Sequence, residues 1–240
     1  TPGMPASPLA ITWIGHGTCL FRSPGGKRLL VDPWLKTNPA CPPAWHQPKD
    51  IDAVLITHGH SDHIEDAAGV ARATGAEVIA NFEIVTWLAK KGVKNGRPMN
   101  KGGTQEVEGV RFTMTHAIHS SGIEDGGQVV YGGEPCGYVL TLGDGTRIYH
   151  AGDTAVFSDM ALIGELYSPE IALLPIGDLF TMSPREAAVA ARLLKSKLIV
   201  PSHYGTFPPL TGTPAMHMEE LKKLGVRSEV LALAPGESAG

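Results

Sequence analysis

Residues 57–63 read Thr57-His58-Gly59-His60-Ser61-Asp62-His63, and the rest of the chain is organised around this stretch. The residues before it, 52–57, form an apolar run rich in β-branched side chains, which is typical of a buried strand. Residues 64–73 after it predict a helix with acidic residues in its first turn. The stretch therefore predicts a polar loop at the junction of a strand and a helix.

Four potential metal ligands lie within six residues of this loop: His58, His60, Asp62 and His63. Without a partner, such groups would repel one another, and their burial would cost free energy. His58 and His60 alternate along an extended segment and can point the same way, while Asp62 and His63 can face a second point. The loop could thus serve two adjacent cations. The alternative is a solvated polar turn that contains histidine.

The His-x-His-x-Asp-His pattern at 58–63 resembles the signature of the metallo-β-lactamase superfamily. Three further stretches, 151–154 (Ala-Gly-Asp-Thr), 175–178 (Pro-Ile-Gly-Asp) and 203–208 (His-Tyr-Gly-Thr-Phe-Pro), resemble the UPF0173 group of metal-dependent hydrolases, which is akin to the ascorbate-6-phosphate lactonase branch. The resemblance spans nearly the whole chain. It implies an α/β fold of four layers, the αβ/βα sandwich, in which two mixed sheets lie face to face with helices outside.

Strands and helices alternate along the chain, and polar residues follow the carboxyl ends of the strands, where α/β sheets bind ligands. We interpret residues 1–240 as one domain with halves at about 1–116 and 117–240. The loop over 120–135 contains five glycines, and we expect an active-site flap there that carries Tyr131 or Glu124. A helix over 214–224 and a strand over 228–233 are expected to close the domain.

Two helix starts carry local capping signals. Asn81 is a plausible N-cap for a helix over 82–91, with Gly92 just beyond its end. Ser183-Pro184-Arg185-Glu186 reads as a capping box with proline at the first helical position. We expect the second helix to run to about Lys195.

The resemblance also implies a ligand set. Site one would contain His58, His60 and His119, site two would contain Asp62, His63 and His203, and Asp153 would bridge the two metals. His116 is the alternative to His119, which we prefer because it enters the glycine-rich loop within a His-Ser-Ser sequence. Asp153 could instead be a turn residue, and His203 could be a core histidine bonded to a carbonyl group.

Four further residues are candidates for supporting the ligands or binding the substrate: His16, Asp32, Asp178 and Tyr204. His16 lies between two glycines, where it could reach the pocket or cap a turn. Asp32 precedes Pro33, as turn-forming aspartates often do. The resemblance favours a different role for Asp32, as a carboxylate that accepts a hydrogen bond from a ligand histidine.

Imidazole and carboxylate ligands without thiolate suit zinc, which is our first expectation, and also manganese or iron. Two divalent metal ions about 3.5–4 Å apart would activate a bridging water or hydroxide. Asp62 and Asp153 are the candidate catalytic residues that orient this nucleophile. The expected enzyme is a metal-dependent hydrolase acting on a small ester, lactone or phosphodiester. Alternatives on the same fold are a mononuclear iron dioxygenase, a nuclease or phosphodiesterase, and a non-catalytic metal-stabilised module.

The amino-acid composition limits the classes of molecule that the chain is expected to bind. The chain has 240 residues, 42% hydrophobic and 18% charged, with a formal net charge of −4, so we expect a small-molecule substrate and no nucleic acid. No apolar run has the length of a membrane span, and residues 1–8 lack the pattern of a signal peptide. The three cysteines show no metal-type spacing, which favours reduced thiols in a cytoplasmic protein. A homo-oligomer is compatible with these features.

Overall fold

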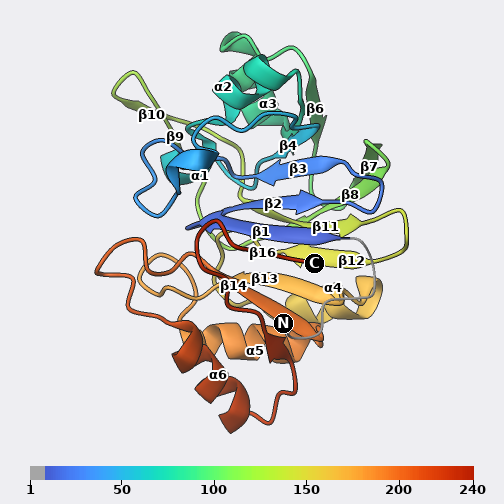
Figure 1. The fold of residues 1–240 in the computed structure, drawn as a ribbon, viewed down its shortest axis with the longest axis vertical. Helices are drawn as coiled ribbons and strands as arrows, with labels where there is room; N and C mark the ends of the chain where they lie inside the picture. Colours follow the sequence, from blue (N-terminus) through green and yellow to red (C-terminus); the bar gives the residue numbers. More distant parts are fainter. Residues whose placement is uncertain (1–8) are drawn as a thin grey trace.

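Two seven-stranded sheets form the centre of the molecule in this computed structural model, which describes residues 9–240 (Figure 1). The interpretation of residues 1–8 as lacking a signal peptide lies outside this range. The first sheet has the spatial order β16 (Ser238–Ala239), β1 (Ala10–Gly15), β2 (Thr18–Arg22), β3 (Arg28–Val31), β4 (Ala53–Leu55), β5 (Glu77–Asn81) and β6 (Gly96–Met99). The second has the order β15 (Glu229–Val230), β14 (Leu198–Ser202), β13 (Ile171–Pro175), β12 (Arg147–His150), β11 (Cys136–Thr141), β8 (Val110–His116) and β7 (Thr104–Val107).

Both sheets are mixed. In the first, β1, β2 and β3 form an antiparallel meander, and β3 to β6 are parallel to their neighbours. In the second, β7, β8, β11 and β12 are antiparallel, and β12 to β15 are parallel. Neighbouring parallel strands end at a common edge, so the loops that follow them are brought together.

Helices cover the outer faces of the two sheets, which gives the four expected layers (Figure 1). Helices α2 (Ala67–Thr74) and α3 (Phe82–Lys90) pack on the first sheet. Helices α4 (Met160–Tyr167), α5 (Pro184–Leu194) and α6 (Pro214–Lys223) pack on the second. The longest helix in the described range, α5, has 11 residues, and no helix there could cross a membrane.

Three apolar clusters separate these layers. The central cluster joins the inner faces of both sheets and includes Phe21 and Leu55 from the first and Phe112 from the second. Val54, directly before Leu55, belongs instead to the cluster under α2 and α3. Because successive side chains of a strand face opposite ways, both faces of β4 are buried, and its sequence is apolar without alternation.

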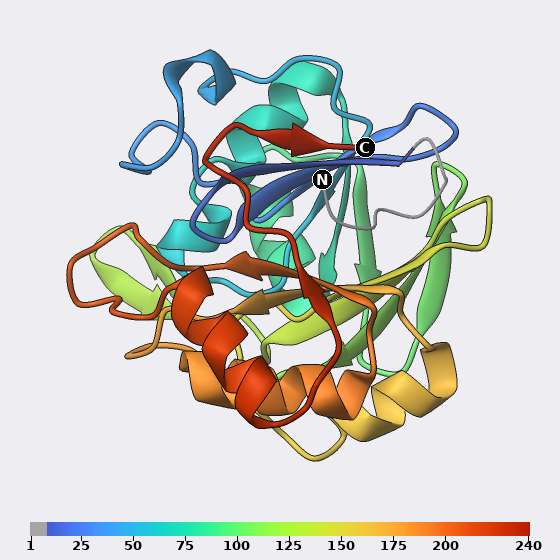
Figure 2. The same ribbon diagram turned by 60° about the horizontal axis from the view of Figure 1, so that its bottom comes forward.

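The division between the sheets differs from the expected boundary near residue 116. The first sheet ends at β6 and the second begins at β7, so the chain changes sheets between Met99 and Thr104. The last strand, β16, then returns to the first sheet and pairs with β1, as Figure 2 shows by the red strand beside the blue one. A pairing over more than two hundred residues leaves no local trace in the sequence.

The helix expected over 64–73 is two helices. Helix α1 (Ser61–Ile64) ends before Glu65, and α2 begins at Ala67. The break occurs at Asp66, whose Oδ2 accepts a hydrogen bond from the Leu35 backbone and whose own N–H donates to the Pro33 carbonyl. Residues 33–49 contain five prolines and form the proline-rich loop. Contacts with this loop therefore interrupt the helix at Asp66.

The glycine-rich loop over 120–135 contains a β-hairpin, which the sequence interpretation missed. Strands β9 (Ile123–Asp125) and β10 (Gln128–Val130) are joined by Gly126 and Gly127, both with positive φ. This Gly-Gly turn is a recognised hairpin signal. Asp125 accepts hydrogen bonds from Trp87 and Lys91, which tie the hairpin to α3.

Two other elements differ in extent. The strand expected over 228–233 is only the two-residue β15. Strand β6 was not expected because Gly96 and Pro98 both disfavour strands. Its position at the edge of the sheet explains why proline is tolerated there.

Candidate metal centre

The seven expected ligands lie at one end of the two sheets, in loops and in the short helix α1. His58 and His60 follow β4, Asp62 and His63 lie in α1, and the other three follow strands of the second sheet: His119 after β8, Asp153 after β12 and His203 after β14. The loops that carry them lie on the left of Figure 1, around α1. Residues separated by up to 145 positions are thus brought into one cluster.

Two groups of side chains in the cluster match the expected sites, and a third group that could hold a cation, Asp32, His58 and His63, overlaps both of them. His58, His60 and His119 offer ligand atoms within 4.8 Å of one another, as expected for site one. Asp62, His63 and His203 form the second group together with His16. His16 had been expected only as a supporting or substrate-binding residue.

One oxygen of Asp153 faces both groups. Its Oδ2 lies 3.5 Å from His58 Nε2 and 3.6 Å from His119 Nε2 in the first group. The same oxygen lies 3.0 Å from His63 Nε2 and 3.1 Å from His203 Nε2 in the second group. A carboxylate oxygen between two sets of imidazoles is compatible with a ligand shared by two cations.

The donor set fits a pair of divalent cations. Ligand atoms bound to one zinc ion at about 2.0–2.2 Å lie roughly 2.8–3.6 Å apart at right or tetrahedral angles, and the four distances to Asp153 fall in this range. Within residues 9–240, the buried Nε2 atoms of His58, His63 and His203 have no hydrogen-bond partner. Buried polar atoms without partners are rare, and a cation would satisfy all three.

Asp32 orients one histidine of each group. Its Oδ2 lies 2.8 Å from His63 Nδ1 and also accepts a hydrogen bond of 2.6 Å from the Thr57 hydroxyl. Thr57 Oγ1 in turn lies 2.9 Å from His58 Nδ1. Because the other ring nitrogen is occupied in each case, Nε2 is the atom left to face a metal. The geometry thus supports the role that the resemblance implied for Asp32.

Burial and neighbouring charges shift the pKa values of the side chains in the cluster. Burial alone would lower the pKa of His203, but the neighbouring Asp153 and Asp62 carboxylates raise it to about 9. Burial would raise the pKa of Asp153, and the adjacent His203 and His63 hold it well below its usual range. For His58, burial and the nearby His63 lower the pKa well below the usual value. The carboxylates are therefore held in the ionised form that a metal ligand requires.

His116, the alternative to His119, lies outside both groups. Its exposed ring stands edge-on to Phe157, and its Nδ1 lies 3.0 Å from Lys101 Nζ. His119 is half-buried and points toward Asp153. The described geometry therefore agrees with the choice of His119.

Asp178 and Tyr204 do not join the cluster. The exposed Asp178 accepts a hydrogen bond from the Leu179 backbone and so closes its own turn. The Tyr204 ring stacks on Trp13, with 4.8 Å between ring centroids, and its hydroxyl donates to the Leu233 carbonyl. Tyr204 follows the expected ligand His203, and Asp178 lies just after β13 (Ile171–Pro175). Neither position in the sequence predicts these local contacts.

Comparison with known proteins decides the family. The family described as "Beta-lactamase superfamily domain" matches residues 27–204. A UPF0173 metal-dependent hydrolase from Solibacter usitatus is 55% identical over 95% of this chain and 98% of its own length. One from Methanopyrus kandleri is 46% identical over 96% of this chain and 99% of its own length. The chain belongs to the UPF0173 metal-dependent hydrolase family.

A solved structure of a relative agrees with this UPF0173 assignment. The metallo hydrolase Igni18 from the archaeon Ignicoccus hospitalis superposes with a TM-score of 0.84 and is 35% identical, and the match covers 96% of this chain and 97% of Igni18. The expected family, the sandwich fold and the class of enzyme, a metal-dependent hydrolase, are confirmed.

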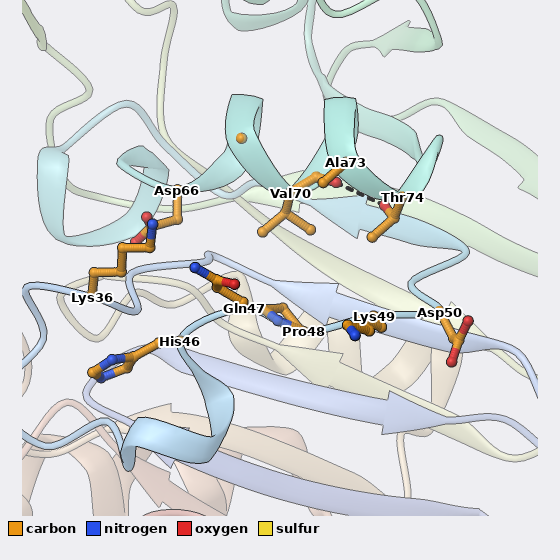
Figure 3. A pocket seen from close by; sticks show the side chains of 11 residues that line it. Lys36, His46, Gln47, Pro48, Lys49, Asp50, Asp66, Val70, Ala73 and Thr74 are labelled. Atoms are coloured by element: carbon orange, nitrogen blue, oxygen red, sulfur yellow. Dashed lines mark hydrogen bonds between the residues drawn. The ribbon is translucent and has the colours of Figure 1, made fainter.

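Two cavities adjoin the centre of this UPF0173 protein. One of about 460 Å³ is lined by His60, Ser61, Asp62, Ser120, Gly122, Glu124 and Val129. Another of about 360 Å³ lies on the side of His119 and includes Lys101 and Tyr131. A larger cavity of about 610 Å³, between α2 and the proline-rich loop, contains none of the seven expected ligands (Figure 3).

Sequence reasoning missed three polar residues around the centre. Thr57 relays the Asp32 contact to His58, and Thr206 lies 2.7 Å from His16 Nδ1. Ser121 accepts a hydrogen bond from the Gly59 N–H and so ties the histidine loop to the hairpin segment. Thr57 was open to prediction because it directly precedes His58, whereas Thr206 and Ser121 become neighbours of the site only through folding.

Proposed function

We propose that this chain hydrolyses a small ester, lactone or phosphodiester at a centre that holds two divalent cations. Site one consists of His58, His60 and His119, and site two of Asp62, His63 and His203, with Asp153 between them. Zinc is the metal proposed, and manganese or iron would fit the same nitrogen and oxygen ligands.

The position of Asp153 carries this proposal. Four imidazole Nε2 atoms surround its Oδ2 at 3.0 to 3.6 Å, two from each group of ligands. Asp153 is almost completely buried, so a charge there without cations nearby would be costly. A single metal would leave part of this converging set unused, which speaks against the mononuclear alternative.

Cations bound here would supply Lewis acidity and a water of lowered pKa, as in other two-metal hydrolytic sites. The protein contributes position. Asp32 and Thr57 hold the rings of His63 and His58, while Asp153 and the half-buried Asp62 orient the attacking water.

The adjoining cavity supports a small substrate. Its volume of about 460 Å³ lies within the range of about 300–1,000 Å³ that is typical of small-molecule sites. Its lining contains the carboxylates Asp62 and Glu124 but neither lysine nor arginine, which disfavours the many phosphates of a nucleic acid.

We also propose that the enzyme works in the cytoplasm. Cys19, Cys41 and Cys136 are all buried free thiols, as expected in a reducing compartment. Burial raises the pKa of the Cys41 thiol to about 11 and that of Cys136 to about 12, so neither is poised to react.

The proposal is tested by elemental analysis of the purified protein, followed by a hydrolysis screen over lactones, esters, thioesters, β-lactams and phosphodiesters. We expect close to two metal ions per chain. His60→Ala and Asp153→Ala should lose metal and hydrolysis together while the circular dichroism spectrum is retained. His46→Ala, which alters a histidine outside the cluster, serves as the control. Normal turnover by Asp153→Ala, or a single metal in the active protein, would contradict the proposal.

A further inference from the structure

His16 is the one histidine of the second group whose two ring nitrogens both have partners. Nε2 lies 2.7 Å from Asp62 Oδ2, and Nδ1 lies 2.7 Å from Thr206 Oγ1. The side chain is 1% exposed and comes from the turn Gly15-His16-Gly17, in which His16 has a φ of 56°. A non-glycine residue in this conformation costs free energy, so the turn is held by its surroundings.

The same turn contacts a proposed ligand through its backbone. The carbonyl of His16 accepts hydrogen bonds of 2.9 Å from the His203 N–H and from Trp13 Nε1. These backbone contacts place the imidazole against site two, with 3.9 Å between the ring centroids of His16 and His203. These contacts are made by the backbone and do not require the His16 side chain.

Two observations distinguish His16 from His63 and His203, the other histidines of its group. The Nε2 atoms of His63 and His203 have no hydrogen-bond partner within the described range, whereas His16 is satisfied without a cation. Its distance to Asp62 is also that of a hydrogen bond and is shorter than the roughly 2.8–3.6 Å expected between two ligands of one metal. The His16 ring therefore contacts Asp62 by a hydrogen bond.

We propose that His16 is a positioning residue that holds the Asp62 carboxylate toward the second cation. An ionised carboxylate only accepts hydrogen bonds, so Nε2–H of His16 must donate to Asp62 Oδ2. In the neutral ring Nδ1 then accepts from the Thr206 hydroxyl at 2.7 Å, a shorter contact than the 3.4 Å between that hydroxyl and the Tyr204 carbonyl. Asp62, Thr206 and His16 thus form one oriented chain that ends at site two.

The inference rests on the proposed pair of cations and predicts an asymmetric effect on them. Outer contacts of metal ligands are typically worth about 10- to 100-fold in metal affinity. His16→Leu removes the donor to Asp62 and keeps an apolar side chain in the buried space. We expect the affinity for one of two zinc ions to fall about 10- to 100-fold, and the affinity for the other to stay unchanged.

The experiment is a zinc titration of the metal-free protein in competition with a chromophoric chelator. His16→Gln is the rescue variant, because its side-chain amide can still donate to Asp62, and we expect it to recover most of the lost affinity. His46→Leu is the matched control, because His46 belongs to none of the metal-capable groups in residues 9–240. Thr206→Val, which removes the Nδ1 contact, should weaken the same zinc ion roughly two- to tenfold. It also provides a test if His16→Leu does not fold.

Three outcomes would overturn the inference. In the first, His16→Leu and Thr206→Val both bind two zinc ions with the affinities of the unaltered protein. In the second, His16→Gln loses a zinc ion completely, and the visible spectrum of its cobalt form shows one imidazole ligand fewer, which would make His16 a ligand. In the third, the unaltered protein binds fewer than two ions. Only this last result removes the proposed function as well.

Discussion

Three non-glycine residues of the metal centre have left-handed backbone conformations: His16, Asp32 and His203 have φ values of 56°, 48° and 55°. Such conformations cost about 1–3 kcal/mol each and persist only where neighbouring contacts hold them. Asp32 and His203 directly follow strands, and the sharp turn at each directs the side chain into the cluster. At the scale of single residues, the site is therefore positioned by strained strand ends.

Gly17 illustrates how closely the backbone approaches the ligands. A Cβ atom at Gly17 would lie 2.5 Å from His63 Cε1, far inside contact distance, and His63 is fully buried. Gly17→Ala should therefore displace the His63 ring and break its hydrogen bond to Asp32. We expect loss of one metal ion, measured by elemental analysis, with circular dichroism retained.

Gly143→Ala is the control for this substitution, because a Cβ atom there meets no atom within 4 Å. It should leave the metal content unchanged. Full metal content in Gly17→Ala would mean that His63 can move without losing its ligand role.

Helices α3 and α5 start at the capping residues that the sequence predicted. Asn81 accepts a hydrogen bond from the Ile84 N–H at the start of α3, and Ser183 accepts one from the Glu186 N–H at the start of α5. Because these contacts span three residues, they depend on short-range sequence alone. The elements that were misplaced are those whose ends are decided by distant partners, such as the break at Asp66 between α1 and α2.

Removal of the N-cap of α5 gives a prediction at the scale of a single helix. Ser183→Ala loses the acceptor for the Glu186 N–H and should lower the free energy of unfolding by about 1 kcal/mol. Urea denaturation measures the change, and the slope of the unfolding free energy against urea concentration should be the same in the variant and the unaltered protein. Ser183→Asp keeps a capping oxygen and should remain within a few tenths of a kcal/mol of the unaltered protein. Equal loss in both variants would show that the cap is not the cause.

At the scale of the whole molecule, the centre is assembled from both sheets. The proposed site one would take His58 and His60 from the first sheet and His119 from the second, and the proposed site two would likewise combine His63 with His203. A cation held by both sheets binds the folded chain and not the unfolded one. Metal binding is therefore expected to stabilise the entire fold.

This coupling predicts a metal-dependent unfolding temperature. At free zinc about 100-fold above the dissociation constant, linkage contributes about 2.7 kcal/mol, which corresponds to roughly 5–10 °C for a domain of this size. In scanning calorimetry, the unfolding temperature of chelator-treated protein should be lower by this amount, and added zinc should restore it. Asp153→Ala should show a much smaller shift. Identical unfolding with and without zinc would argue against a site shared by the sheets.

Resemblance to a known family predicted the family, the fold class and the ligand set, and the seven expected ligands lie together in the structure. Two short patterns are visible in the sequence itself: apolar runs that form buried strands, and His-x-His-x-Asp-His at the junction of β4 and α1. The resemblance, and no local pattern, assigned His119, Asp153 and His203. Local signals also determined most strands and the helix caps. The supporting role of Asp32 was implied by resemblance and agrees with its contacts.

Three features appear only in the folded chain: the division of the strands between the sheets, the return of β16 to β1, and the polar residues that surround the ligands. The tertiary structure also separated His16, whose two nitrogens are satisfied, from histidines whose Nε2 atoms are left for a metal, and it excluded Asp178 and Tyr204 from the cluster. The physical reason is that hydrogen bonding of a side chain depends on neighbours that folding brings from distant segments. No local pattern specifies those neighbours.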